Sequence, residues 1–327
     1  MNVSVIIPVY NALEFIEQAV SSAHIHADVK EILVIDDGST DGSLDLCLRI
    51  EERYAKVKVL QHPDGVNRGA SASRNLGISH ATQELIAFLD ADDVYLPNRF
   101  DAERTIFSQC PDIDGVYGAT EAEFITEAGK KRFNDARMKP LTTISHWVAP
   151  DEVVWVLFGM SVHATGHFSC DALTVKKDLL RKTGGFDHAL SYGEDTDLII
   201  RMSVMGKLAA GSIERPVAVR GVHDANRVTN VKVANQHKEV FWSKIFEWGR
   251  VHGMPQELVD ASRIRALSWK THSKGVVFGI AFLVKMPYKH PDLWSSPQYY
   301  RRSVFGVFGE TFLSKALVRI RRFPKMQ

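Results

Sequence analysis

The N-terminal part of the chain alternates between two hydrophobic periodicities. Short apolar runs rich in β-branched residues predict strands at residues 3–9 (VSVIIPV), 31–36 (EILVID), 57–61 (VKVLQ) and 84–90 (ELIAFLD). Between the first two runs, Ile16, Ala19, Val20 and Ala23 recur at helical spacing. Strands that alternate with helices are typical of a parallel sheet covered on both faces. The predicted fold class is therefore α/β.

Later segments extend this pattern. The runs DGVYGA, CDALTV and RPVAVRGVH (residues 215–223) predict further strands of a mixed sheet. DLLRKTGGFD predicts a helix that ends at Gly184 and Gly185, and DTDLIIRMSVMG predicts one that ends at Gly206. After about Ala225 the pattern is helical to the end, so we expect a boundary near residues 225–235.

Composition narrows the class of protein. The chain has 327 residues, 45% hydrophobic and 24% charged, with a formal net charge of +1. These values are ordinary for a soluble globular protein and exclude one that seeks polyanions with its whole surface, so no nucleic-acid partner is expected. The three cysteines are far apart and form neither a metal-ligand pair nor a disulfide framework. We expect a reducing, cytoplasmic location and no signal peptide.

The C-terminal segment differs from the rest in charge. Residues 296–327 contain seven basic side chains and one acid, and TFLSKALVRIRRF at 311–323 has an apolar stripe beside a basic one. One interpretation is peripheral contact with an anionic membrane at its inner face. The other is a helix that packs on the remaining protein with its basic face in water. The sequence leaves both open.

Side chains suited to ligand binding follow three of the predicted strands. They are Pro8 and Tyr10, then Asp36 and Asp37, then Asp90, Asp92 and Asp93. In an open parallel sheet, ligands bind beyond the carboxyl ends of the strands, where these groups would meet. Carboxylates this close repel one another unless a cation lies between them. Oxygen ligands favour Mn²⁺ or Mg²⁺, and Mg²⁺ completes its shell with phosphate oxygens. The pattern predicts a metal-bound diphosphate.

The sequence excludes two classes of nucleotide-binding protein, the dinucleotide-binding fold and the P-loop nucleotide triphosphatases. PVYNAL follows the first strand without the glycines that a dinucleotide fold needs, and no phosphate-binding G-x-x-x-x-G-K-[ST] occurs.

Each of the acidic motifs, taken alone, also has a simpler explanation. DDGSTDG is also turn chemistry, and DADD and GED also suit the N-terminus of a helix.

Six blocks taken together resemble the family 2 glycosyltransferases. In chain order they are VSVIIPVYNALEFIEQAVSSA, EILVIDDGSTDGS, GASASRNLGI, LIAFLDADDVYLPNRF, GGFD and GEDTDLIIRM. They span about residues 1–225. The resemblance implies a GT-A fold, a Rossmann-like mixed sheet with helices on both faces, followed by a C-terminal helical appendage. It implies a catalytic domain at 1–228, with a nucleotide-sugar-binding half at about 1–110 and an acceptor half at about 111–228, and a helical region at 229–327.

The resemblance also assigns roles to individual residues. The nucleotide-sugar site would comprise Pro8, Tyr10, Asp36, Asp37, Arg68 and Asp90, with Asp37 favoured for the base. Mn²⁺ or Mg²⁺ would be held at Asp92, Asp93 and His223, without a choice between the two aspartates. Asp195 would be the general base, supported by Glu194.

The activity implied is that of an inverting, metal-dependent glycosyltransferase of the hexosyl- or N-acetylhexosaminyl-transferase class. The donor would be a nucleotide-diphosphate sugar, UDP-linked by expectation, and the acceptor a saccharide or lipid-linked saccharide in polysaccharide biosynthesis. Self-association is a further expectation for the C-terminal region. The alternatives are a non-catalytic nucleotide-sugar or carbohydrate-binding protein and a sugar nucleotidyltransferase. The latter would need a glycine-rich basic loop after the first strand, which PVYNALEF does not supply.

Overall fold

A computed structural model describes residues 1–224, 226 and 231–272. The chain divides into two compact units, Met1–Val231 and Lys232–Gln327. The strands are β1 (Val3–Val9), β2 (Val29–Asp36), β3 (Val57–Gln61), β4 (Leu85–Phe88), β5 (Asp93–Tyr95), β6 (Gly115–Tyr117), β7 (Ala119–Phe124), β8 (Leu141–Thr142), β9 (Leu173–Lys176), β10 (Leu208–Ala210) and β11 (Pro216–Val222).

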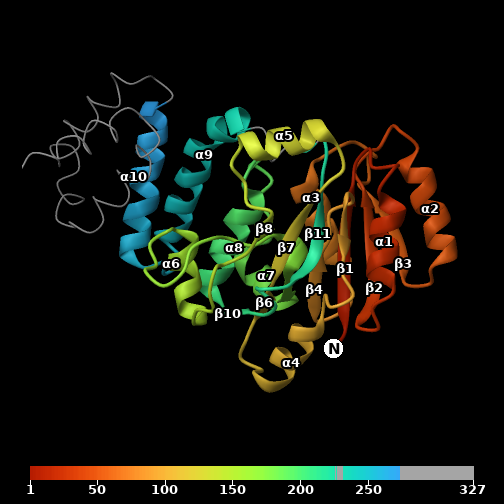
Figure 1. Cartoon of the computed structure of the whole chain (residues 1–327), viewed down its shortest axis with the longest axis horizontal. Helices are drawn as coiled ribbons and strands as arrows, with labels where there is room; N and C mark the ends of the chain where they lie inside the picture. Colours follow the sequence, from red (N-terminus) through yellow and green to blue (C-terminus); the bar gives the residue numbers. More distant parts are fainter. Residues whose placement is uncertain (225, 227–230, 273–327) are drawn as a thin grey trace, which may run out of the picture. The chain divides into compact units, whose positions relative to one another are not determined.

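The helices of the first unit alternate with these strands along the chain and are labelled in Figure 1. They are α1 (Ile16–His24), α2 (Ser43–Arg53), α3 (Ala70–His80), α4 (Asp101–Gln109), α5 (Glu127–Asp135), α6 (Val153–Leu157), α7 (Lys177–Thr183) and α8 (Glu194–Met205), with short 3-10 turns at Pro150–Glu152 and Cys170–Ala172.

The first unit is built on a seven-stranded sheet with the order β10-β6-β9-β4-β1-β2-β3. β1 pairs in parallel with β2 and β4, and β2 with β3, whereas β9 runs antiparallel to β4 and β6. The parallel half follows from the strand–helix alternation of the N-terminal sequence, since each crossover helix returns the chain to the same edge. The predicted α/β class is confirmed.

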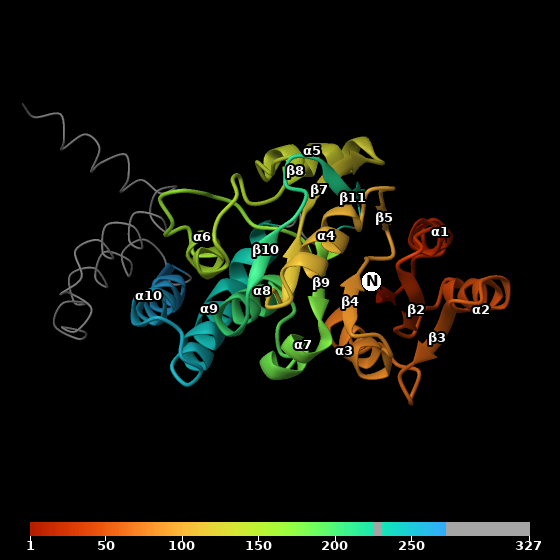
Figure 2. The same ribbon diagram turned by 90° about the horizontal axis from the view of Figure 1, so that it is seen from below.

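Alternating side chains of β1 feed two separate cores. Ile6 belongs to a cluster with Ile78 of α3, while Val5 and Ile7 belong to a second cluster with Val20 of α1. The sheet is therefore covered on both faces, and Figure 2 shows α3 and α7 on the side opposite α1 and α2. Burial on both faces explains why the strands read as continuous apolar runs.

A smaller sheet has the order β5-β11-β7-β8. β11 pairs antiparallel with β5, which sets Arg220 opposite Asp93, and parallel with β7. The sequence predicted the β11 segment but not β5 or α5, because these are short and rich in charge. This sheet matters for the site, since it brings residue 223 back to the turn that follows β4.

The strand predicted at residues 84–90 is shorter in the structure. β4 ends at Phe88, so Asp90 lies in the turn beyond the strand and not at its last position. The apolar residues Leu89 and Ala91 are still buried, which made this turn look like a strand in the sequence.

The second unit is described as far as its first two helices, α9 (Val231–Gly249) and α10 (Gln256–His272). Their buried residues include Phe241, Ile245, Leu258 and Ile264. In the described ranges, no helix is both long enough and apolar enough to cross a membrane. The basic segment at 311–323 lies outside the described residues.

Gly77 provides a test of the packing between α3 and β1. A Cβ atom at this position would lie 2.5 Å from Cγ2 of Ile6, inside the first core. We expect Gly77→Ala to lower the free energy of unfolding by about 1–3 kcal/mol, since overpacking outweighs the gain in helix propensity. Urea denaturation measures this. Ser79→Ala, on the exposed side of the same helix, should change it by less than about 0.5 kcal/mol, and equal effects would contradict the packing described.

Candidate active site

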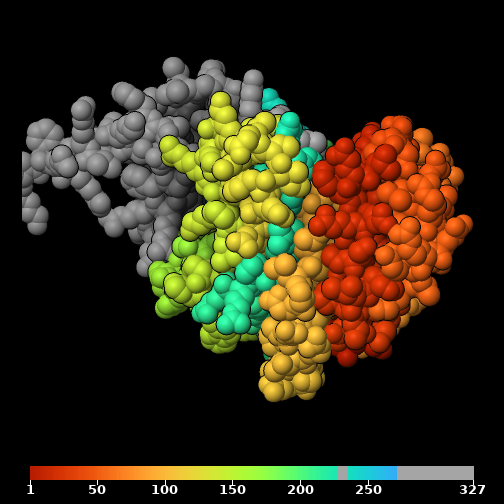
Figure 3. All heavy atoms as spheres, turned by 45° about the vertical axis from the view of Figure 1, so that its right-hand side comes forward, coloured from red at the N-terminus to blue at the C-terminus, as the bar shows by residue number. Residues whose placement is uncertain are grey.

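The carboxyl ends of β1, β2 and β4 meet at one edge of the large sheet. Val9, the last residue of β1, pairs with Asp36, and the backbone N–H of Asp37 donates to Val9 O at 2.8 Å. On the other side of β1, the N–H of Leu89 donates to Ile6 O at 3.1 Å. In Figure 3 these N-terminal segments (red to orange) lie beside the segments from the middle of the chain (yellow to cyan). The predicted donor residues thus share one edge.

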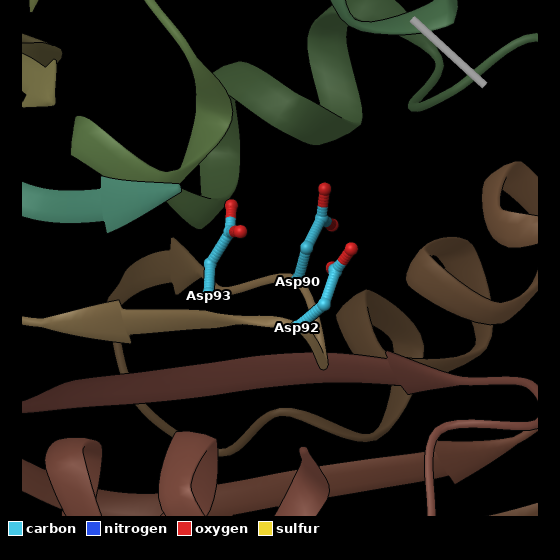
Figure 4. Close-up of side chains that lie close together, drawn as sticks. All are labelled: Asp90, Asp92 and Asp93. Carbon is cyan, nitrogen blue, oxygen red and sulfur yellow. The ribbon is translucent and has the colours of Figure 1, made fainter. Parts of the chain in front are cut away.

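Asp90, Asp92 and Asp93 form a compact acidic cluster. One carboxylate oxygen from each lies within 4.8 Å of the others. The three side chains leave the turn after β4 in the same direction (Figure 4). Oxygen donors at this separation fit a hard divalent cation such as Mn²⁺ or Mg²⁺. The chemistry of the residues present therefore agrees with the predicted metal.

Asp92 is tied to the end of β11. Its Oδ2 lies 2.9 Å from Nε2 of His223 and accepts a hydrogen bond from Nδ2 of Asn226 at 3.1 Å. The ring of Phe15 stacks on the His223 ring, with centroids 5.0 Å apart. The hydrogen bond to Asp92 raises the pKa of His223. The structure thus brings His223 to Asp92, which is more than a hundred residues away in the chain, and Asp93 lies in the same cluster as Asp92.

Asp93 has different surroundings. Its side chain is buried, and Oδ1 accepts a hydrogen bond from the N–H of Gly221 at 3.0 Å. Burial, with Asp171 and Asp92 close by, raises the pKa of Asp93 well above its usual range. Asp171 is buried too, and its Oδ1 accepts the backbone N–H of Asp90 at 3.0 Å. Both acids thus bind main-chain N–H groups at or next to the turn, Asp171 that of Asp90 and Asp93 that of Gly221.

Glu194 and Asp195 open helix α8, where the helix dipole favours acids. Gly193 precedes them with φ +78°, which turns the chain sharply into the helix. Oδ1 of Asp195 lies 3.1 Å from Nη1 of Arg74, and Glu194 lies 4.0 Å from the same nitrogen. The other end of the guanidinium, Nη2, donates to Oδ1 of Asp90 at 2.6 Å.

Arg74 lies at the centre of these contacts and was not among the predicted site residues. Its side chain is only 4% exposed, and one guanidinium joins the turn after β4 to the start of α8. The signal was present, because a charged residue on the buried face of α3 needs a charged partner. Its partners, Asp90 and Asp195, could not be identified without the fold.

The surroundings of Asp195 suit a proton acceptor. Its partial burial raises the pKa of Asp195 to about 6, with Glu194 acting in the same direction and Arg74 opposing it. The side chain remains 35% exposed, so a substrate can reach it. A general base works best when its pKa lies near the working pH.

The predicted nucleotide residues follow β1 and β2. Tyr10 is 52% exposed at the sheet edge. A ring that stacks on a ligand has to be exposed in this way. Asp37 accepts the backbone N–H groups of Arg68 and Gly69 at 2.7 and 2.8 Å, and so anchors the loop before α3. The side chain of Arg68 pairs with Asp64 at the exposed end of that loop. Buried Asp36 orders the turn after β2 through the N–H of Gly38.

Residues 4–141 match the family model described as "Glycosyl transferase family 2". They belong to that family. The match includes the segments that carry Asp37 and Asp90–Asp93, so the resemblance inferred from the sequence blocks is confirmed.

Curated relatives of this chain include a protein named as a glycosyltransferase. The chain is 39% identical over 119 residues to the uncharacterized glycosyltransferase alr2836 from Nostoc sp., which covers 36% of this chain and 35% of the relative. It is 38% identical over 98 residues to the succinoglycan biosynthesis protein ExoU from Rhizobium meliloti, covering 30% of this chain and 28% of ExoU. The matched part of the chain spans about a third of the length of these relatives.

Solved structures extend the likeness across the fold. S. aureus TarS 1–349, in complex with UDP-GlcNAc, superposes with a TM-score of 0.60 at 15% identity, covering 95% of this chain and 80% of that one. The mannosyltransferase PcManGT from Pyrobaculum calidifontis, in complex with GDP-Man and Mn²⁺, gives 0.54 at 18%, covering 94% and 88%. The predicted GT-A fold is confirmed.

Proposed function

We propose that this chain is a metal-dependent, inverting glycosyltransferase that uses a nucleotide-diphosphate sugar. The observation that carries the proposal is the position of Arg74. It binds Asp90, in the acidic turn suited to the donor, and Asp195, the best-placed proton acceptor, through opposite ends of one guanidinium. Asp90, on the donor side, and Asp195, as the general base, would therefore act on the same sugar.

In this proposal Asp195 removes the proton from the acceptor hydroxyl. The hydroxyl oxygen attacks the anomeric carbon as the bond from that carbon to the nucleoside diphosphate breaks. Glu194, next to it, orients the base or a sugar hydroxyl. A single carboxylate on the acceptor side suffices for direct displacement, which inverts the anomeric centre. General-base assistance of this kind typically contributes about 10²–10⁴ in rate.

Asp92 and His223 would hold the metal, and Asp90 would bind the nucleotide sugar next to it. Asp92 is 28% exposed and His223 14%, so both can reach a bound ion. Asp93 would act by shaping the turn, because it is buried and already bonded to Gly221. When bound, the divalent ion supplies Lewis-acid stabilisation of the leaving diphosphate.

The relatives support a proposal for the substrate class. TarS was crystallised with UDP-GlcNAc and PcManGT with GDP-Man and Mn²⁺, which supports a hexosyl or N-acetylhexosaminyl donor and a divalent metal. We favour a UDP-linked donor, with the base beside the loop that Asp37 anchors and flanked by Pro8 and Tyr10. ExoU, a succinoglycan biosynthesis protein, supports a saccharide or lipid-linked saccharide acceptor in polysaccharide biosynthesis.

The remaining expectations complete the proposal. Residues 1–228 would form the catalytic domain, with the donor half before about residue 110, and residues 229–327 a helical region for acceptor, membrane or self-association. We place the protein in the cytoplasm, with peripheral contact at the inner face of the membrane through the basic segment. A non-catalytic nucleotide-sugar-binding protein is the rival, and it gives no reason for a carboxylate with the raised pKa of Asp195 beside the acidic turn.

A thermal-shift panel tests the proposed function. Nucleotide sugars and nucleoside diphosphates are added with Mn²⁺, with Mg²⁺, or with a chelator. We expect one nucleotide class to raise the melting temperature in the presence of metal, since ligands that bind only the folded state stabilise it by mass action. Release of nucleoside diphosphate from the same donor should follow. If every donor leaves the melting temperature unchanged with metal present, the proposal is wrong.

A further inference from the structure

Asn75, the residue after Arg74 on α3, binds the main chain of the turn that precedes α8. Its Nδ2 donates to the carbonyl of Phe186 at 2.8 Å, and its Oδ1 accepts the N–H of Phe186 at 2.9 Å. A second contact joins Nδ2 to Nε2 of His188 at 2.6 Å. The amide thus pairs with both polar groups of one residue, as a neighbouring strand would.

The glycines of this turn allow the pairing. Gly184 and Gly185 have φ values of +82° and +70°, a region that other residues rarely adopt. A Cβ atom on Gly185 would lie 2.5 Å from Oδ1 of Asn75. The sequence GGF is therefore what lets α3 approach the turn closely enough for Asn75 to reach Phe186.

The fixed position of Phe186 in turn supports Arg74. The Phe186 ring is 2% exposed and meets Phe88 edge-on, with centroids 5.3 Å apart. The guanidinium carbon of Arg74 lies 5.2 Å from the centroid of the Phe186 ring. A cation over an aromatic face is attracted to it, and the effect is larger when water is excluded. The contacts therefore run from Asn75 to Phe186 and from Phe186 to Arg74.

We propose that Asn75 and Phe186 are positioning residues, which hold Arg74 so that it aligns Asp195 with Asp90. This inference rests on the proposed function. Its physical basis is that Asp90 and Asp195 lie on segments that are distant in sequence, and catalysis requires their relative placement to be held closely. A misplacement of about 1 Å can lower turnover about 10²-fold.

The test separates turnover from nucleotide binding. Asn75→Ala removes the pairing with Phe186, and Phe186→Leu removes the ring beneath Arg74 while leaving the main-chain bonds to Asn75. For each variant, calorimetry gives the affinity for the nucleoside diphosphate, and release of that diphosphate from the donor gives kcat. We expect kcat to fall about 10²-fold for Asn75→Ala and about tenfold or more for Phe186→Leu. Nucleotide affinity should stay within about threefold, because neither residue contacts the predicted base or metal sites.

Asn75→Asp provides a graded comparison, and Ser79→Ala a matched control. The aspartate still accepts the N–H of Phe186 but opposes its carbonyl, so kcat should lie between those of wild type and Asn75→Ala. Ser79, on the same helix, is exposed and bonds only to Leu76 and His80 among the described residues, so its loss should leave kcat unchanged.

Four results would overturn the inference. The first is a normal kcat in both main variants together with a lower melting temperature, which would make the contacts purely structural. The second is a parallel loss of nucleotide affinity and kcat, which would place the defect in the donor site. The third is a wild-type protein that turns over no donor, which would refute the proposed function and this inference with it. Normal wild-type turnover with unaffected variants would refute the inference alone.

Discussion

Replacing Asp195 by asparagine is expected to lower turnover about 10²–10⁴-fold, the usual contribution of a general base. Asparagine keeps the shape of the side chain and can still contact Arg74, but it cannot accept the proton of the acceptor hydroxyl. Nucleotide binding should be nearly unchanged, since Asp195 stands at the far end of the guanidinium from Asp90. The readouts are donor turnover and the melting-temperature shift given by the nucleoside diphosphate.

The pH dependence of turnover is an independent test of Asp195 as the general base. The pKa of Asp195 is raised to about 6, and only its deprotonated form can act as a base. The turnover of the wild type should therefore rise with pH and level off above about pH 6 to 7. Asp178→Asn is the control, because Asp178 is exposed on α7 and pairs with nearby Arg181, away from the acidic turn. Wild-type turnover in Asp195→Asn would mean that another group is the base.

Replacing Asp92 by asparagine is expected to remove most of the binding of the metal ion. Asp92 is partly exposed and contacts His223. Its replacement by asparagine removes one negative charge from the surroundings of the ion. We expect Mn²⁺ affinity to fall about 100-fold or more, because changes to residues that only support ligands already cost about 10- to 100-fold. Electron paramagnetic resonance of free Mn²⁺ in a titration measures it without a donor.

Asp93→Asn is the matched comparison for Asp92→Asn. Its amide oxygen can still accept the N–H of Gly221, and burial already disfavours the charge of Asp93. Mn²⁺ affinity should therefore fall by about tenfold, the low end of the range for residues that only support ligands. A larger loss in Asp93→Asn than in Asp92→Asn would exchange the roles assigned to the two residues.

The parallel half of the fold could be predicted from sequence because its signals are local. The strand at Val3–Val9 and that at Val57–Gln61 have the predicted bounds, and Gly184 ends α7 where the sequence placed a helix stop. Apolar runs and glycine punctuation require no tertiary information. The same holds for the gathering of Asp90, Asp92 and Asp93, which are adjacent in the chain.

Contacts between distant segments could not be predicted in this way. Arg74 was passed over, although it is the residue that joins Asp90 to Asp195. β5 and β11 pair across more than a hundred residues, and this pairing places His223 beside Asp92. Periodicity says that a residue is buried, but only the topology says what it is buried against. The family resemblance supplied His223 from a motif, and the fold supplied the reason for its position.

Anomalous diffraction from crystals grown with Mn²⁺ and the nucleoside diphosphate selected in the thermal-shift panel tests the central claim most directly. We expect one manganese peak in contact with a carboxylate oxygen of Asp92 and Nε2 of His223, bridging to the diphosphate, with Asp195 facing the position of the transferred sugar. A nucleotide bound elsewhere, or a manganese ion that contacts neither Asp92 nor the diphosphate, would contradict it.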